Sequence, residues 1–169
     1  MSELTDLYNE IQVCQACILS QGRTNAVPGS GPEDAEIMFI GEGPGFHEDR
    51  QGEPFVGAAG KYLEELLEQI GIERNDVYIT NVVKCRPPGN RDPQPDEVSA
   101  CKTYLDKQID LIRPRLVVTL GRFSMQRYFP GASISRIHGQ PKRVGNVIKV
   151  WCRLSDERGC DTLMPDWKP

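Results

Sequence analysis

The stretch IMFIGEGPGFHEDRQGEPFVG, residues 37–57, decides the fold of this chain. It opens with a short apolar run, Ile37–Ile40, that predicts a buried strand, and it is followed by residues 58–70, where leucines recur at helical spacing. Seven of the seventeen residues 41–57 are Gly or Pro, which suits close backbone approach better than core packing. Loops at the carboxyl ends of parallel strands are where open α/β sheets bind ligands. Residues 41–57 are therefore predicted to form a binding site.

Apolar runs alternate with helical patterns along the rest of the chain. We expect strands at 37–40, 77–83, 116–120 and 144–150, helices at 3–13, 58–70 and 96–112, and a shorter helix at 121–128. This alternation predicts an α/β fold, a three-layer α/β/α sandwich around a central, mostly parallel, four-stranded sheet. A length of 169 residues suits one domain with a buried core.

Composition excludes some classes of protein. The chain is 38% hydrophobic and 26% charged, and it has no run of eighteen apolar residues, so we expect no membrane partner. Its first residues lack the basic and apolar regions of a signal peptide, so we expect a cytoplasmic location and reduced thiols. A net charge of −4 disfavours a large nucleic-acid footprint, although only the contacting face matters. Basic residues cluster at 84–91 and 136–153. Each cluster is either solvated surface or a contact for nucleic acid.

Four cysteines are candidate metal ligands. Cys14 and Cys17 are separated by two residues, whereas fifteen residues separate Cys85 from Cys101. Four thiolates can bind a tetrahedral zinc ion or an iron–sulfur cluster, although the wide second pair departs from the usual zinc spacing. The alternative is buried free thiols beside a chance Cys-x-x-Cys.

The glycine-rich stretch resembles motif 1 of the family 4 uracil-DNA glycosylases. The shared pattern is Gly-Glu-Gly-Pro-Gly at 41–45, Glu-Asp at 48–49 and Gly-x-Pro-Phe-Val-Gly at 52–57. The resemblance implies a monomeric DNA-repair hydrolase that removes uracil from deaminated DNA after the base has been flipped from the duplex. It also implies a [4Fe–4S] cluster, which Cys14, Cys17, Cys85 and Cys101 would hold within a domain of residues 1–150.

The resemblance assigns a role to each candidate residue of the site. Phe55 would be the platform for the flipped base, and Asn81 would read uracil through its amide, which can accept from N3–H and donate to O4. Glu42 would be the catalytic residue, stabilising a developing oxocarbenium ion and positioning water. The Gly43 amide would support the departing base or the water, and Glu48 would exclude the thymine methyl group. The alternatives are that Phe55 is a core aromatic residue, that the Asn81 amide caps a turn, and that the Glu42 carboxylate braces backbone amides.

The end of the chain departs from the family. The family's second motif, His-Pro followed by small residues, should follow the last strand, but no His-Pro occurs, and the two histidines are His47 and His138. Residues 151–169 are therefore predicted to be a divergent tail. Loss of one oxyanion-type donor costs about 2.7–4 kcal/mol of transition-state stabilisation. The alternative to an active enzyme is thus a catalytically impaired iron–sulfur protein that binds uracil or DNA, or a damaged gene product.

Overall fold

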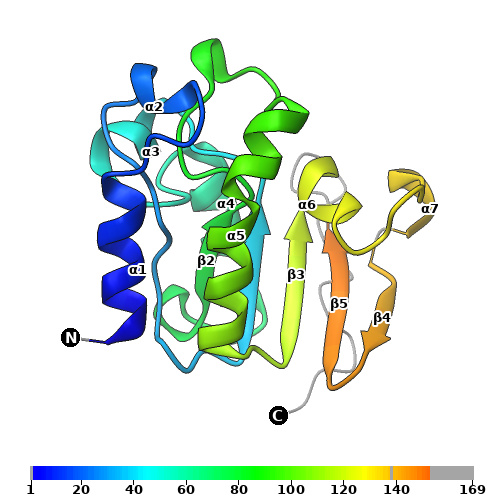
Figure 1. Cartoon of the computed structure of the whole chain (residues 1–169). Coiled ribbons are helices and arrows are strands. Elements are labelled where there is room, and N and C mark those ends of the chain that lie inside the picture. Colours follow the sequence, from blue (N-terminus) through cyan, green and yellow to red (C-terminus); the bar gives the residue numbers. More distant parts are fainter. Residues whose placement is uncertain (1, 138, 153–169) are drawn as a thin grey trace.

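The computed structural model describes residues 2–137 and 139–152, which form a twisted sheet with helices on both faces (Figure 1). The sheet has five strands in the order β2-β1-β3-β5-β4. The strands are β1 (Ile37–Gly41), β2 (Tyr78–Asn81), β3 (Leu116–Leu120), β4 (Pro141–Val144) and β5 (Val147–Cys152). The helices are α1 (Glu3–Gln12), α2 (Leu19–Gly22), α3 (Phe46–Gln51), α4 (Ala58–Gln69), α5 (Pro95–Ile112), α6 (Arg122–Gln126) and α7 (Ile134–Ile137), with 3-10 turns at Arg74–Asp76 and Pro88–Asn90.

The centre of the sheet is parallel and buried on both faces. β1 pairs in parallel with β2 and β3, and β3 pairs in parallel with β5. Every residue of β1, β2 and β3 is buried, as expected for strands with helices on both sides. Their carboxyl ends lie at one edge of the sheet, where the loops after β1 and β2 meet.

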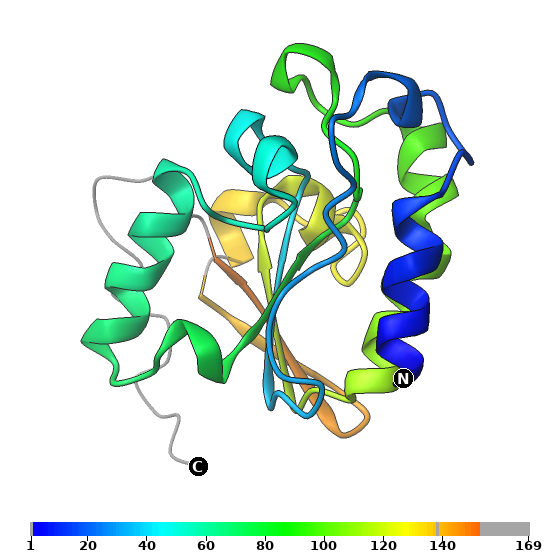
Figure 2. The same cartoon turned by 90° about the vertical axis from the view of Figure 1, so that its left-hand side faces the viewer.

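Helices cover the two faces separately (Figure 2). On one face, α1 and α5 pack against side chains such as Met38 and Ile40. On the other face, α4 packs Leu63 and Leu67 against Phe39 and its neighbours. This arrangement confirms the predicted three layers and the helices expected at 3–13, 58–70 and 96–112. No helix in the described ranges is long and apolar enough to cross a bilayer.

The prediction of four strands was wrong, because the segment 144–150 holds a hairpin turn rather than one continuous strand. β4 ends at Val144, the chain turns through Gly145 at φ +61°, and β5 begins at Val147, antiparallel to β4. Pairing with an existing strand, rather than apolar patterning, makes β4 a strand, since all four of its residues are exposed. β5 runs to Cys152, so the first two residues of the predicted tail belong to the sheet. Residues 153–169 lie outside the described residues.

Candidate active site

A pocket of about 450 Å³ opens at the carboxyl ends of β1 and β2, a volume typical of small-molecule sites. The glycine-rich loop forms most of its wall, and α3 and the start of α4 complete it. Four of the five residues predicted for catalysis and base recognition line this pocket: Gly43, Glu48, Phe55 and Asn81. The fifth, Glu42, lies outside the lining residues although its neighbour Gly43 belongs to them.

Asn81 and Phe55 meet over Gly41. Asn81 is the last residue of β2 and pairs in register with Gly41, the last residue of β1. A Cβ atom at Gly41 would lie 2.4 Å from Asn81 Oδ1 and 2.6 Å from Phe55 Cζ, so only glycine admits both side chains. Asn81 is 2% exposed, and its side-chain amide has no hydrogen-bond partner among the described residues. The buried side-chain atoms without a partner in the described part of the chain do not include this amide, so it opens into the pocket, where a ligand can pair with it.

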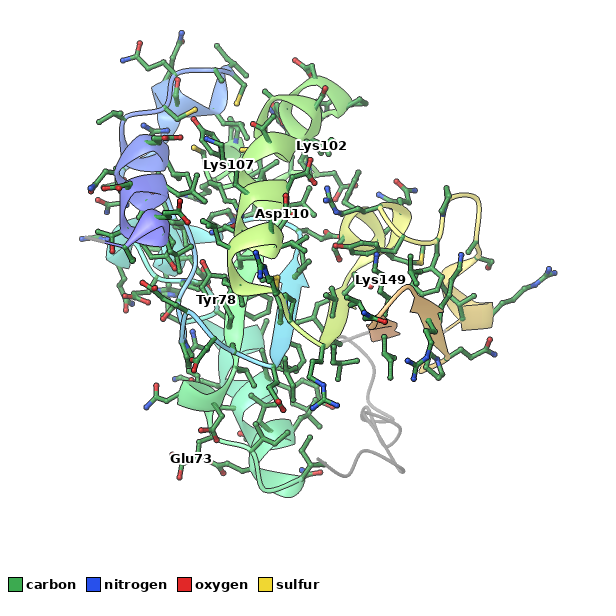
Figure 3. The ribbon with its side chains drawn as sticks, turned by 60° about the horizontal axis from the view of Figure 1, so that its bottom comes forward. Glu73, Tyr78, Lys102, Lys107, Asp110 and Lys149 are labelled. Atoms are coloured by element: carbon green, nitrogen blue, oxygen red, sulfur yellow. The ribbon has the colours of Figure 1, made fainter. Side chains whose placement is uncertain are left out.

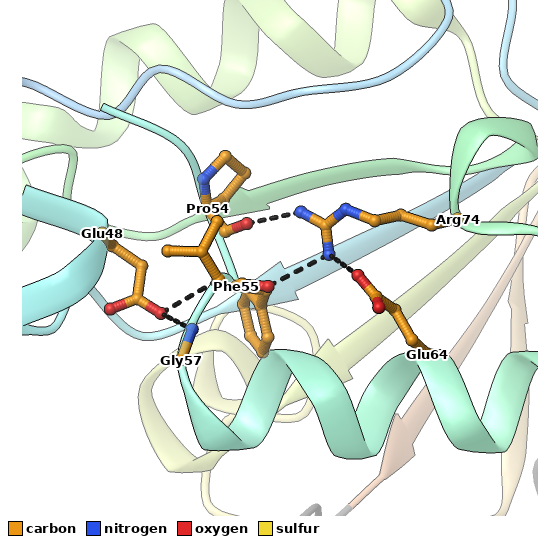
Figure 4. A network of polar contacts seen from close by, with 7 residues as sticks. Glu48, Pro54, Phe55, Gly57, Glu64 and Arg74 are labelled. Atoms are coloured by element: carbon orange, nitrogen blue, oxygen red, sulfur yellow. Dashed lines mark hydrogen bonds and ion pairs between the residues drawn. The ribbon is translucent and has the colours of Figure 1, made fainter. Parts of the chain in front are cut away.

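An arginine holds the backbone of Phe55 in place (Figure 4). Phe55 has φ +52°, an uncommon conformation for a bulky residue. Arg74 donates one hydrogen bond to the Phe55 carbonyl at 3.1 Å and another to the Pro54 carbonyl, and it lies 3.5 Å from the Glu64 carboxylate. These contacts come from the turn after α4, so Phe55, the predicted platform, is fixed by a segment that sequence spacing did not identify.

Glu48 braces the same loop from the side opposite Arg74 (Figure 4). Its Oε1 accepts hydrogen bonds from the amides of Val56 at 3.1 Å and Gly57 at 2.9 Å. The neighbouring Asp49 is buried and turns away from the pocket, because its Oδ1 accepts from the Thr24 amide at 2.8 Å. The two acidic residues thus anchor α3 to two different loops, and only Glu48 lines the pocket.

The carboxylate of Glu42 contacts the start of α6. Its Oε1 accepts hydrogen bonds from the amides of Arg122 at 2.7 Å and Phe123 at 3.3 Å. Gly121 makes this possible, because a Cβ there would lie 2.5 Å from Glu42 Oε1. Oε2 accepts no hydrogen bond from the described residues. One oxygen therefore positions the carboxylate by bracing amides, and the other stays available.

All four predicted cysteine ligands line one small pocket beside α1 and α5. Arg23 Nη1 donates to Cys85 Sγ at 3.1 Å, and the Ala16 amide donates to Cys14 Sγ at 3.4 Å. Burial raises the pKa of the Cys85 thiol, and it raises that of Cys101 to about 11. Bound iron or zinc would offset that cost, since metals bind the thiolate.

The spacing of the thiols bears on which group could bind. Among the described residues, no three His, Cys, Asp or Glu side chains converge closely enough to hold one metal ion. In a four-iron cluster each thiolate binds a different iron, so the sulfur atoms need not converge on one point. Four cysteines around one pocket, with Arg23 donating to a sulfur atom, therefore fit a cluster better than a lone zinc ion.

Lys84 is the residue that the sequence analysis placed wrongly, as part of a basic surface cluster. It is 1% exposed, and Nζ donates to Thr80 Oγ1 at 2.7 Å, to the Asn81 carbonyl at 2.8 Å and to Gln108 Oε1 at 2.6 Å. Burial lowers its pKa to about 7. The network continues from Gln108 to the hydroxyl of Tyr78, labelled in Figure 3, at 2.9 Å. The apolar run around Lys84 was the one sequence signal for its burial.

The later basic cluster lies far from the pocket in strand order. Its members Lys142 and Lys149 lie on β4 and β5, whereas the pocket adjoins β1 and β2. Lys149, labelled in Figure 3, places Nζ 3.9 Å from the centre of the Tyr128 ring, a cation–π contact.

Comparisons with known proteins agree with this arrangement. The profile of the Uracil DNA glycosylase superfamily matches residues 28–159. A type-4 uracil-DNA glycosylase of Archaeoglobus fulgidus is 52% identical over 158 residues, which cover 89% of this chain and 79% of that protein. Type-4 enzymes of Sulfurisphaera tokodaii and Saccharolobus solfataricus are 53% and 55% identical over 146 and 130 residues, covering 83% and 76% of this chain. The chain spans 66% and 60% of those two proteins, somewhat less than two thirds of each.

Proposed function

The chain belongs to the type-4 uracil-DNA glycosylases, and from this membership we propose that it hydrolyses the N-glycosidic bond of uracil in deaminated DNA. The observation that carries the proposal is the Asn81 amide, which lines the pocket beside the Phe55 ring and has no hydrogen-bond partner among the described residues. Its substrate would be uracil-containing DNA, and the reaction would start base-excision repair. We further expect a monomer in the cytoplasm.

Recognition of uracil would use two side chains. Uracil offers a donor at N3 and an acceptor at O4, and one amide can satisfy both, whereas cytosine presents the opposite pattern at these positions. The Asn81 amide has no competing partner among the described residues, so it is free to make both bonds. The Phe55 ring, which lies against Gly41, would stack on the flipped base. The fixed backbone of Phe55 means that little ordering is required when the base binds.

Rejection of thymine would fall to Glu48. Its carboxylate lines the pocket and is fixed by the Val56 and Gly57 amides, so it cannot turn aside without loss of both hydrogen bonds. The thymine methyl group would displace water from the Glu48 carboxylate without replacing the hydrogen bonds of that water. Such desolvation of a charge is unfavourable.

Hydrolysis would depend on Glu42. Water attacks C1′ of the sugar, the C1′–N1 bond breaks, and its electron pair leaves with the uracil base. The proton that the water gives up neutralises the uracil anion. A carboxylate near C1′ stabilises the positive charge that develops on the sugar and orients the water. The contacts of Glu42 Oε1 with α6 support this role, because they fix the carboxylate and leave Oε2 for water. The Gly43 amide would stabilise negative charge on the leaving base.

The four cysteines would hold a [4Fe–4S] cluster. When bound, the cluster would supply a covalent cross-link between the segment after α1, the segment after β2 and α5. Because Cys85 lies four residues after Asn81, that link would also stiffen the strand end that carries the base reader. Iron content and the visible absorption of purified protein test this proposal directly.

A base-release assay tests the glycosylase. Protein purified without oxygen, with its iron content measured, is incubated with a uracil-containing oligonucleotide, and alkali then cleaves abasic sites. Release of uracil is the expected result, with a large loss in Glu42→Gln and little change in the control Asn75→Gln, which alters an exposed residue of the turn after α4. Tight binding without release from folded, iron-loaded protein would instead support the impaired binding protein.

A further inference from the structure

An exposed aromatic ring lies at the rim of the pocket. Phe46 is the first residue of α3, it lines the pocket entrance, and it is 45% exposed. Its ring meets the His47 ring edge to face at 5.4 Å. Phe55 already serves as the proposed platform, so Phe46 is a second aromatic side chain that lines the pocket.

Two guanidinium groups flank this ring. The Cζ atom of Arg50 lies 5.6 Å from the centre of the Phe46 ring, and that of Arg86 lies 5.2 Å from it. Arg50 comes from the end of α3, and Arg86 comes from the segment after β2, where Asn90 Oδ1 accepts from its Nε at 2.7 Å. Asn90 also lines the pocket, so the position of Arg86 is tied to the pocket wall.

Neither Arg50 nor Arg86 has a carboxylate partner among the described residues. Five other arginines do pair with carboxylates: Arg74, Arg91, Arg115, Arg122 and Arg127. In a chain of net charge −4, two unneutralised cations beside one pocket form a local positive surface. An aromatic face between two cations matches the chemistry of a nucleotide, which offers a base to stack and phosphates to pair.

We propose that Phe46, Arg50 and Arg86 bind the nucleotide next to the flipped uridine: its base stacks on Phe46, and the flanking phosphates contact the two arginines. This inference rests on the proposed function, since it needs a uridine in the pocket. In free protein both guanidinium groups lie over the Phe46 ring, and the base takes the place of one of them when DNA phosphates, which are stronger partners, draw that guanidinium off the ring. Base stacking is insensitive to sequence, so Phe46 would bind any neighbouring base.

Binding measurements test the two parts of the surface separately. The probe is a fluorescent single-stranded oligonucleotide with one 2′-fluoro-2′-deoxyuridine, whose glycosidic bond resists hydrolysis. Phe46→Ala should weaken binding about tenfold, as expected for loss of one base–aromatic stack, and Phe46→Trp should restore it. Arg50→Gln and Arg86→Gln should each lower the slope of log affinity against log salt by about 0.7, the value for one phosphate contact on a single strand.

Arg113→Gln is the matched control. Arg113 is exposed and has no carboxylate partner among the described residues, but it lies beyond the carboxyl end of α5, at the opposite edge of the sheet from the pocket. Its variant should bind as the wild type does, with the same salt slope. Unchanged affinity in Phe46→Ala, or arginine variants that behave like Arg113→Gln, would overturn the inference. The wild-type base-release assay decides the proposed function independently, because it uses none of these variants.

Discussion

Substitution of Gly121 by alanine should displace the carboxylate of Glu42 while leaving that side chain chemically unchanged. Gly121 has φ +106°, and an added Cβ would lie 2.5 Å from Glu42 Oε1, 2.7 Å from Cγ and 2.8 Å from Cδ. Real Cβ atoms do not approach side chains so closely, so the carboxylate has to move. Gly71 supplies the control, because it has φ +74° and no atom within 4 Å of the position of an added Cβ.

The two variants share a positive φ, and only Gly121→Ala also displaces a carboxylate. Both put a residue with a Cβ at positive φ, which costs about 1–2 kcal/mol at position 71 and about 1–3 kcal/mol at position 121, where φ +106° and ψ 173° lie in a region essentially limited to glycine. Gly71→Ala should lose the first of these amounts of unfolding free energy. Gly121→Ala should lose the second and about 1–3 kcal/mol more, the usual cost of crowding a packed site. If Glu42 acts at the sugar, a shift of about 1 Å in its carboxylate should also slow base release by roughly a hundredfold.

Urea unfolding and single-turnover release of uracil, both on iron-loaded protein, measure the two quantities. Glu42→Gln should slow release strongly, and adding Gly121→Ala to it should slow release little further, because both changes act through one carboxylate. A folded Gly121→Ala protein that releases uracil within threefold of the rate of Gly71→Ala would refute the placement of Glu42 in the reaction.

Three further predictions concern buried polar groups. Asn81→Asp should reduce selectivity for uracil over cytosine, as measured by release of both bases from matched oligonucleotides; unchanged selectivity would remove Asn81 as the reader. Lys84→Met should cost about 1–3 kcal/mol in urea unfolding at equal iron content, because the Asn81 carbonyl loses its donor while Gln108 Oε1 keeps the Thr80 hydroxyl. A neutral result would mean that water replaces the ammonium. Arg91→Gln should raise the pH at which acid unfolds the protein, because two hydrogen bonds from Arg91 hold the pKa of Glu97 below its usual value. Their stabilisation is present above the ordinary glutamate pKa and is lost as the pH falls through the lowered pKa. An unchanged midpoint of acid unfolding, measured by circular dichroism, would contradict this assignment.

The sequence predicted those parts of the fold that depend on local pattern. β1 and β3 are continuous apolar runs, and α4 and α5 carry apolar residues at helical spacing, so each followed from its own residues. β4 did not, because its exposed residues become a strand by pairing with β5. The pairing of distant segments, rather than propensity, decides such an element.

The site shows the same division between local and distant information. The glycine-rich loop and the pair Cys14 and Cys17 could be found from spacing, whereas Cys85 and Cys101 were assigned as ligands through the family resemblance. The partners of these groups could not be found in either way. Arg74 holds Phe55 from nineteen residues away, and Glu42 meets the Arg122 amide across eighty. Lys84 is buried because Gln108, twenty-four residues later, accepts from it.

The glycines of the site act mainly by receiving other side chains. Gly41 receives Asn81 and Phe55, Gly121 receives Glu42, and an added Cβ at Gly45 would lie 2.8 Å from Glu48 Oε2. Asn81, Phe55 and Glu42 therefore each lie against a glycine from another segment, and Glu48 lies against the glycine that caps the start of its own helix. The sequence shows these glycines but not which side chain each one accommodates, since that depends on the register of β1 with β2 and on the position of α6. Alanine at Gly41 should accordingly impair base recognition as severely as loss of the Asn81 amide itself.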